Sequence, residues 1–156
     1  IIFKKLIKMK ILDILSPTRV FPNVECNSKK AAMELLAKNI ASSNNGIDQI
    51  DVIGCLIARE RLGSTGLGNG IAIPHGRLKY CEKTIATFIQ LNNGIDYGAI
   101  DNMPVDLIFA LIVPEESTDE HLQILAILAK MLSETETVDK LRNSKTAKEI
   151  FSILTN

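Results

Sequence analysis

The sequence predicts an α+β fold of the α/β/α sandwich kind, in which helices cover both faces of a central mixed β-sheet. The run from Leu107 to Val113 is almost wholly apolar and of strand length, which is typical of a central strand covered on both faces. Segments with helical periodicity lie on both sides of it in the chain, without the strict strand-helix alternation of a doubly wound nucleotide-binding fold. With 156 residues, 46% of them hydrophobic, the chain has the size of one ordinary domain.

The N-terminal part is expected to form an edge strand and a first helix. The strand spans Thr18 to Cys26, and Pro22 restricts it to an edge of the sheet. Asn27 or Ser28 is suited to cap the helix that follows, and Asn44-Asn45-Gly46 stops it. The apolar positions that share one face of this helix are Ala32, Leu35, Leu36 and Ile40.

A second helix is expected from about Asp48 to Arg61. Its expected buried stripe consists of Ile50, Ile53, Leu56 and Ile57. The helix ends beside a glycine-rich loop and brings Arg59, Glu60 and Arg61 to that loop.

Three further strands are expected in the middle of the chain. They span Gly70 to Pro74, Thr84 to Leu91 and Val105 to Val113. The segments Asn92-Asn93-Gly94 and Asp101-Asn102-Met103-Pro104 have the composition of turns between them.

Three helices are expected to complete the chain. Ser117 and Glu120 form a capping-box pattern that opens an apolar helix beginning at His121. Two shorter helices follow, near Glu134 to Arg142 and Thr146 to Leu154. The predicted order of elements is therefore β-α-α-β-β-β-α-α-α.

Charge and cysteine usage exclude several classes of protein. Eighteen basic and eighteen acidic residues cancel, and no block of like charges is present, so the chain has no broad electrostatic footprint for nucleic acid. The cysteines Cys26, Cys55 and Cys81 are odd in number and widely spaced, which indicates a reducing compartment and free thiols rather than disulfides or a zinc site.

No apolar run approaches the roughly 18 residues needed to span a bilayer, so we expect a cytoplasmic protein without stable membrane insertion. The segment Ile1 to Lys8 begins without methionine and lacks the features of a secretory signal. We interpret residues 1–8 as an upstream extension or cloning remnant, Met9 as the natural start, and residues 9–156 as the single domain. A basic amphipathic membrane anchor is the alternative for residues 1–8.

The run from Gly63 to Gly76 is the most informative segment for function. It holds five of the nine glycines, at positions 63, 66, 68, 70 and 76, and it places His75 between Pro74 and Gly76. Glycines allow positive φ angles or the close approach of another molecule. Because Pro74 removes a backbone donor, we expect the strand to end there and to leave His75 accessible at a sheet edge or rim.

His121 is the only other histidine. In the first turn of its helix it would lie among free amides, at the positive end of the helix dipole, where an anion is favoured and a protonated imidazole is disfavoured. Both histidines therefore occupy places suited to an anion, of which phosphate is the obvious one.

Other readings of these residues have less support. The glycine run precedes a strand and lacks the Lys-Ser/Thr of a phosphate-binding loop, which argues against nucleotide binding. Two histidines without a third ligand at suitable spacing are a weak metal site. Ser64 lacks the G-x-S-x-G elbow of a serine hydrolase. The alternative without a function is that the glycines form a tight loop and that His75 is a rim histidine hydrogen-bonded to the backbone.

Phosphoryl transfer through histidine fits these residues better. A neutral imidazole nitrogen is a good nucleophile near pH 7, and the phosphoramidate that it forms passes its phosphoryl group onward. Catalysis then needs donors around the phosphoryl oxygens, for which we expect the loop at Gly68, Asn69 and Gly70 together with an arginine. Periodicity does not decide between Arg59 and Arg61.

Two segments identify a resemblance to a known family. ARERLGSTGLGNGIAIPHGRL and AIDNMPVDLIFALIVP, with the helix at His121, resemble the enzyme IIA proteins of the phosphoenolpyruvate-dependent phosphotransferase system, mannitol/fructose type. The similarity is greatest to the nitrogen-regulatory branch and extends from about Met9 to the C-terminus.

The resemblance implies a role for each residue and a set of partners. His75 would be phosphorylated, on Nε2, by a histidine carrier protein of the HPr type. His121 would be the second active-site histidine, and Arg59 rather than Arg61 would hold the phosphoryl group. No metal or cofactor is implied.

Three functions stay open at this point. The chain has no fused IIB or IIC region, which favours a regulatory phosphocarrier that signals through contacts dependent on its phosphorylation. The first alternative is a sugar-specific enzyme IIA that works with a separate IIB protein. The second is a non-enzymatic adaptor that takes up no phosphate.

Overall fold

A computed structural model describes residues 9–42 and 46–156 of the chain. Its element order, from the N-terminus, is α1 (Ile11–Ile14), a 3₁₀ turn (Pro17–Arg19), β1 (Val20–Val24), α2 (Lys29–Ser42), α3 (Gln49–Glu60), β2 (Gly66–Gly68), β3 (Ile71–Ala72), β4 (His75–Leu78), β5 (Ile85–Ile95), β6 (Val105–Pro114), α4 (Thr118–Met131), α5 (Thr135–Asn143) and α6 (Ala147–Thr155). The predicted residues 1–8 and the predicted stop at Asn44-Asn45 lie outside the described part.

The central sheet is mixed, as predicted, with the strand order β1-β5-β6-β3-β2. β5 and β6 are antiparallel, whereas β1 runs parallel to β5 and both β3 and β4 run parallel to β6. β3 pairs with the first half of β6 and β4 with the second half, through Ile71 opposite Leu107 and His75 opposite Leu111. The first strand is at an edge, which accommodates Pro22.

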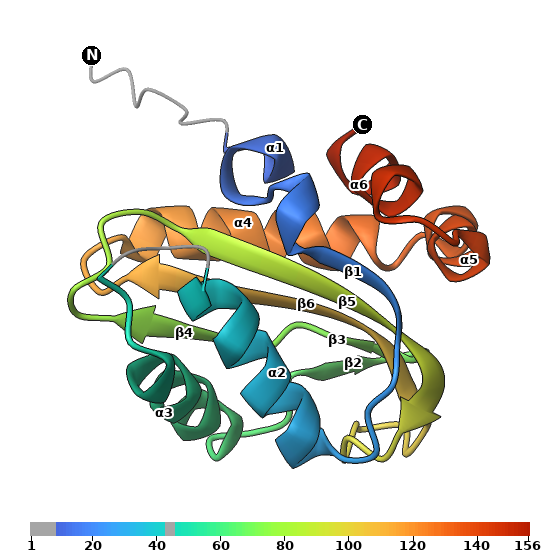
Figure 1. Cartoon of the computed structure of the whole chain (residues 1–156), viewed down its shortest axis with the longest axis horizontal. Helices are drawn as coiled ribbons and strands as arrows, with labels where there is room; N and C mark the ends of the chain where they lie inside the picture. The colour runs from blue at the N-terminus through green and yellow to red at the C-terminus, as the bar shows by residue number, and fades with distance from the viewer. Residues whose placement is uncertain (1–8, 43–45) are drawn as a thin grey trace.

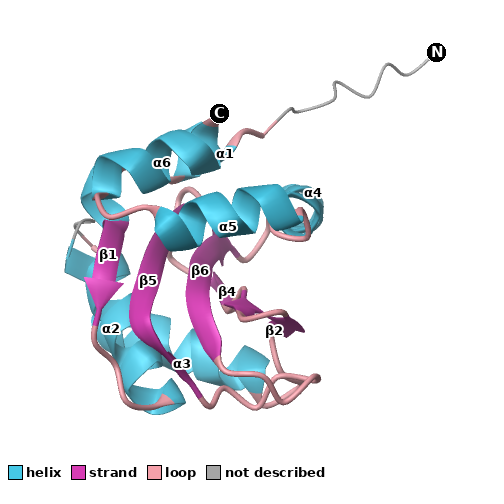
Figure 2. Cartoon of the chain, turned by 90° about the vertical axis from the view of Figure 1, so that its right-hand side faces the viewer, coloured by secondary structure: helices cyan, strands magenta, loops and turns pink. Residues whose placement is uncertain are grey.

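Helices cover both faces, so the predicted α/β/α sandwich is confirmed. In Figure 1, α2 crosses in front of the sheet and α4 runs behind β5. Alternate residues of β6 separate the two cores: Leu107, Phe109 and Leu111 pack with α4, α5 and α6, whereas Ile108 and Ala110 pack with α2 and α3. Figure 2 shows α4, α5 and α6 gathered on one side of the strands. This double burial explains the unbroken apolar run in the sequence.

Two expectations about the strands are wrong. Asn92-Asn93-Gly94 lies within β5, where the pairing with β6 shifts between Gln90 and Ile95, and the turn comes later, with Asn102 at φ 59°. The chain also resumes pairing directly after Pro74, because the Pro74 carbonyl still accepts a hydrogen bond from the Leu111 amide at 3.1 Å. Proline removes a donor but leaves its acceptor available.

Helix α3 lies within one residue of its predicted bounds, and most of its predicted stripe faces the core. Leu56 is fully buried and Ile53 and Ile57 are half-buried, whereas Ile50 is 76% exposed and Val52, which was not predicted, is fully buried. In α2, Met33 and Ala37 are buried with the predicted Ala32, Leu36 and Ile40, and Leu35 is half-buried. Ser28 is the capping residue, since its hydroxyl accepts from the Ala31 amide at 3.1 Å.

The start of α4 also differs from the expectation. Ser117 makes no side-chain cap hydrogen bond and has a φ of −89° and a ψ of 57°, so the predicted capping box with Glu120 does not form. The helix begins at Thr118, which still places His121 within its first turn. None of the helices described in residues 9–42 and 46–156 is long and apolar enough to cross a membrane.

Candidate functional site

The first residue of β4, His75, is buried rather than accessible. It is 9% exposed, which corrects the expectation of an accessible ring. Its position at a sheet edge is as predicted, since β4 pairs with β6 and with no other described strand. Its Nδ1 lies 2.8 Å from the carbonyl oxygen of Ile73. A carbonyl can only accept, so Nδ1 carries the proton and Nε2 carries a lone pair. The backbone thus selects the tautomer in which Nε2 is the nucleophile.

Arg59 lies at the C-terminal end of α3 and faces that lone pair. Its Nε–H donates to His75 Nε2 at 3.2 Å, and its Nη1 donates to the Gly63 carbonyl at 2.9 Å. Because a guanidinium has no acceptor, this contact also requires an unprotonated Nε2. Two independent contacts therefore fix the same tautomer.

The electrostatics keep the His75 ring neutral. Burial lowers its pKa, and the charge of Arg59 lowers the pKa further. The hydrogen bond to Ile73 and the nearby Glu60 carboxylate act in the opposite direction without reversing the shift. A neutral ring near pH 7 is the nucleophilic form.

The second histidine, His121, reaches the same place from α4. Its ring centroid is 5.1 Å from that of His75, with an angle of 74° between the rings. The side chain is buried, 7% exposed, and within the described residues neither ring nitrogen has a hydrogen-bond partner. Burial, followed by electrostatic coupling to His75 and by the charges of Arg77 and Arg59, lowers the pKa of His121 to about 4.

Such an unpartnered ring is costly in a folded protein. A buried polar group without a partner costs about 1–3 kcal/mol, and native structures contain few of them. A ligand on His75 Nε2 would give the His121 ring a partner. The unpartnered ring therefore makes the space beside His75 a candidate site for a group that accepts hydrogen bonds.

The structure does not bring Gly68, Asn69 and Gly70 to this site. The Gly70 carbonyl accepts from the amides of Asp106 and Leu107, whereas His75 pairs with Leu111. Four residues along a strand correspond to about 13 Å. The predicted trio therefore lies at the opposite end of β6, contrary to the expectation that these residues share a site with His75.

The surroundings of the trio are already paired within the protein. The Asn69 amide donates to the Asp101 carboxylate at 2.8 Å. Arg142 binds Asp106 through two hydrogen bonds of 2.9 Å and also donates to the Asn69 carbonyl. Carboxylates beside the loop disfavour a phosphate there.

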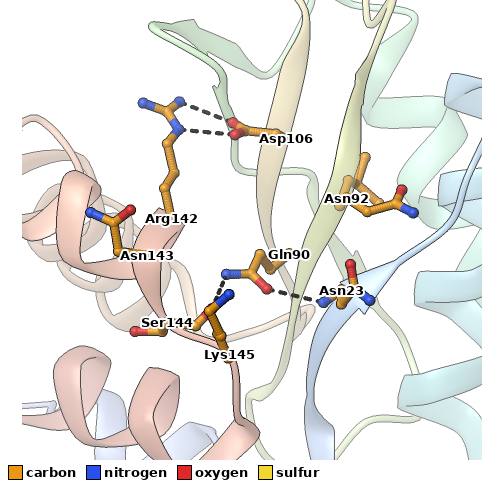
Figure 3. A pocket seen from close by; sticks show the side chains of 9 residues that line it. Asn23, Gln90, Asn92, Asp106, Arg142, Asn143, Ser144 and Lys145 are labelled. Carbon is orange, nitrogen blue, oxygen red and sulfur yellow. Dashed lines mark hydrogen bonds and ion pairs between the residues drawn. The ribbon is translucent and has the colours of Figure 1, made fainter.

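A polar pocket of about 460 Å³ adjoins this end of the sheet (Figure 3). The Gln90 amide nitrogen donates to the carbonyls of Leu141 and Ser144, and its oxygen accepts from the Asn23 amide. Figure 3 also shows the two contacts between Arg142 and Asp106. Because these groups bind one another, the pocket offers less to a ligand than the His75 site does.

The sequence placed Glu60 next to the glycine-rich loop but indicated neither a role for it nor its contacts. The Glu60 carboxylate binds Lys29 and Thr65, and the Thr65 hydroxyl contacts the Tyr97 hydroxyl at 2.8 Å. The position of Glu60 beside Arg59 was the only available signal, since Lys29 and Tyr97 are distant in sequence. In the described part of the chain, no group of three or more His, Cys, Asp or Glu residues could hold a metal ion.

The chain is similar over most of its length to nitrogen regulatory proteins. It is 42% identical to that of Pseudomonas aeruginosa over 146 residues, which cover 94% of this chain and 95% of the relative. It is 38% identical to that of Escherichia coli K12 over 149 residues, covering 95% and 91% of the two chains.

Solved structures show the same fold. The crystal structure of nitrogen regulatory protein IIA-Ntr from Neisseria meningitidis superposes with a TM-score of 0.88 at 38% identity, covering 92% of this chain and 97% of that one. The mannitol IIA of Escherichia coli has a TM-score of 0.76 at 22% identity, covering 90% and 98%, which is a likeness of fold.

The family model for the EIIA 2 component of the phosphoenolpyruvate-dependent sugar phosphotransferase system matches residues 13–156. This match and the identity to the nitrogen regulatory proteins agree with the resemblance found in the glycine-rich segment. The chain therefore belongs to the EIIA 2 family of the phosphotransferase system and is a homologue of its nitrogen regulatory members.

Proposed function

We propose that this chain is a regulatory phosphocarrier that accepts a phosphoryl group on Nε2 of His75 from an HPr-type carrier protein. The observation that carries the proposal is the Nε2 lone pair, fixed by the Ile73 carbonyl and placed between Arg59 and the unpartnered His121. Membership of the EIIA 2 family supports the class of reaction.

In the transfer step, Nε2 of His75 attacks the phosphorus of the carrier's phosphohistidine. The nitrogen–phosphorus bond of the donor breaks, and its electron pair stays on the donor ring. With the proton on its other nitrogen, the donor ring leaves as a neutral imidazole. A new bond joins phosphorus to Nε2, and His75 becomes a protonated phosphoimidazole. Its Nδ1 keeps the proton and donates it in a hydrogen bond to the Ile73 carbonyl, which stabilises the positive ring.

Arg59 and His121 have separate tasks in this step. Once Nε2 bonds to phosphorus, the Arg59 N–H groups are released from His75 and can donate to the phosphoryl oxygens. His121 is neutral at pH 7, so one of its ring nitrogens donates a hydrogen bond to those oxygens. Both contacts strengthen as charge develops on the group being transferred.

Phosphorylation provides the regulatory signal. A phosphoryl group adds nearly two negative charges to a largely buried site in which both histidine rings are neutral and Arg59 is the adjoining cation. Partner proteins that bind near His75 would be favoured or excluded by this charge. Identity of 38–42% to nitrogen regulatory proteins supports a regulatory rather than a transport role.

The test is labelling with phosphoenolpyruvate, enzyme I and the cognate HPr-type carrier. We expect stoichiometric, acid-labile and alkali-stable phosphate in the wild-type chain and none in His75→Ala. Undiminished labelling of His75→Ala would refute the assignment of the nucleophile, and a wild-type chain that takes up no phosphate would support the adaptor alternative.

A sugar-specific enzyme IIA is the second candidate. It is favoured by 30% identity to a fructose-specific EIIA component of Haloferax volcanii over 127 residues, 81% of this chain and 82% of that protein. The two candidates differ in the acceptor. Rapid stoichiometric loss of phosphate to one separate IIB protein would support the sugar-specific function over the purely regulatory one.

A further inference from the structure

A buried carboxylate lies directly behind the phosphoacceptor site, at the last residue of α3. The Glu60 side chain is 8% exposed and binds Lys29 Nζ at 2.8 Å. Its two oxygens also accept from the Thr65 amide at 2.9 Å and from the Thr65 hydroxyl at 2.6 Å. Glu60 therefore links the end of α3 to Thr65, which lies ten residues before His75 in the chain.

From Thr65 a short series of backbone hydrogen bonds leads to the nucleophile. The Thr65 carbonyl accepts from the Ile73 amide at 3.0 Å. The Ile73 carbonyl in turn accepts from His75 Nδ1 at 2.8 Å. Any shift of Thr65 therefore moves the carbonyl that selects the His75 tautomer.

The Glu60 carboxylate also affects the orientation of the Arg59 guanidinium. Because it holds Thr65 against the end of α3, Glu60 closes the turn that contains Gly63. The Gly63 carbonyl accepts from Arg59 Nη1 at 2.9 Å and so orients the guanidinium toward His75. One side chain thereby constrains both partners of the contact between Arg59 and Nε2.

We propose that Glu60 is a positioning residue of this site, which, held by Lys29, keeps the His75 ring in the tautomer with a free Nε2 and keeps Arg59 aimed at that nitrogen. The proposal rests on the proposed phosphocarrier function and names a residue whose hydrogen bonds go to Lys29 and Thr65 and which acts through Thr65 and Gly63. A positioning role would explain why Glu60 and Lys29 form a buried ion pair, since a buried ion pair by itself is weak evidence for stability.

The surroundings of Glu60 keep it ionised. Burial acts to raise its pKa, but the hydrogen bonds from Lys29 and Thr65 and the Lys29 charge outweigh burial, so the pKa of Glu60 is lowered. Lys29 also lies 4.3 Å from the centre of the Tyr97 ring, which holds the ammonium in place. The Lys29 charge compensates Glu60, so a phosphoryl group on His75 would not meet an unbalanced carboxylate.

The experiment compares Glu60→Gln with wild type by nitrogen NMR of the His75 ring and by the kinetics of phosphate uptake. In wild type we expect a single tautomer, protonated on Nδ1. In Glu60→Gln we expect a mixture of tautomers and a lower His75 pKa, since the Glu60 charge raises that pKa. The kcat of uptake falls between about tenfold and a hundredfold, with the KM for the carrier nearly unchanged.

Glu136→Gln is the matched control. Glu136 also pairs with a lysine, Lys140, but it is 85% exposed and lies on α5. It loses the same charge without touching the site, so its His75 spectrum and uptake should match wild type. A Glu60→Gln chain that is merely less stable, with the His75 tautomer and kcat of the control, would overturn the proposal.

Thr65→Val decides the question if Glu60→Gln does not fold. This variant removes one hydroxyl and keeps the Glu60 charge, so we expect mixed tautomers with little change in the His75 pKa. An unchanged tautomer in a folded Thr65→Val chain would also overturn the proposal. The NMR measurement uses unphosphorylated protein, so it decides the role of Glu60 even where the wild-type chain takes up no phosphate and the proposed function fails.

Discussion

The two ends of the glycine-rich segment have opposite characters. At the Gly68–Gly70 end, Arg142 binds Asp106 and the Asn69 amide binds Asp101, so the charged groups are satisfied within the protein. At the His75 end, the buried His121 ring has no partner for either nitrogen among the described residues, and Arg59 donates to the Nε2 lone pair of His75.

The difference between the two ends shows that a high density of glycines does not by itself indicate a ligand site. A Cβ atom on Gly70 would collide with Arg142 and Asp106, and Gly70 also has a φ of 84°, so glycine there admits the protein's own side chains. The buried nitrogens of His121, by contrast, have no hydrogen-bond partner among the described residues, and such groups are rare enough in native proteins to indicate a candidate ligand site.

Arginine variants at the two ends test the comparison with the largest expected effect. Arg59→Lys keeps a positive charge but loses the planar fork, and we expect phosphate uptake to slow by about 10²–10³-fold, as for removal of one donor to a transition state. Arg142→Gln should leave the uptake rate within about threefold but lower the free energy of unfolding by about 1–2 kcal/mol, because Asp106 loses its partner.

Rapid-quench labelling and urea unfolding of both variants provide the measurements. If Arg142→Gln slowed uptake as much as Arg59→Lys does, the two ends would not be functionally distinct. The Gly68–Gly70 loop would then have to contribute to phosphate binding, as expected from the sequence.

The fold was predictable where hydrophobic pattern decides structure. The apolar run of β6 and the periodic apolar positions of the helices predicted the three layers of the sandwich, because burial on one or two faces of an element produces a regular spacing of apolar residues in the sequence. Short strands escaped this reasoning: β4 depends on the acceptor of Pro74 and on a neighbouring strand some 35 residues later in the chain, and Ile50 is exposed because tertiary packing turns Val52 inward.

The site was predictable only in part. His75, His121 and Arg59 were identified from rarity and motif, and the structure brings them together. The loop amides were misplaced because sequence proximity to His75 says nothing about the roughly 13 Å along β6 that separate Leu107, paired with β3, from Leu111, paired with His75. Glu60 was placed beside the loop but given no role, because that role depends on Lys29 and Tyr97, which only the fold brings near.

Acid should destabilise the His75 end selectively. The folded pKa of His121, about 4, lies below the ordinary value of 6.5, so the unfolded chain binds the proton more tightly. The free energy of unfolding therefore falls as the pH drops from about 6.5 to about 4, by up to about 3 kcal/mol from this residue.

His121→Gln removes that contribution, so its free energy of unfolding should depend less on pH than that of wild type within this window. Urea unfolding at several pH values between 7.5 and 4.5 measures the difference, and carboxylate titration cancels because both chains share it. Parallel curves for the two chains would show that the His121 ring is not held neutral by the fold, and the contrast between the two ends would weaken.

Glycine substitutions give the smallest but most specific test of the paired end. Gly70 and Gly98 both have positive φ, 84° and 72°, but a Cβ at Gly98 would meet nothing within 4 Å. Gly98→Ala therefore measures backbone strain alone, about 1 kcal/mol, whereas Gly70→Ala should cost about 1–2 kcal/mol more, because Arg142 and Asp106 must move. The extra cost should shrink in an Arg142→Gln background, while phosphate uptake stays near normal. Equal costs for the two substitutions would mean that the ion pair does not press on the loop, and the glycine at position 70 would need another explanation.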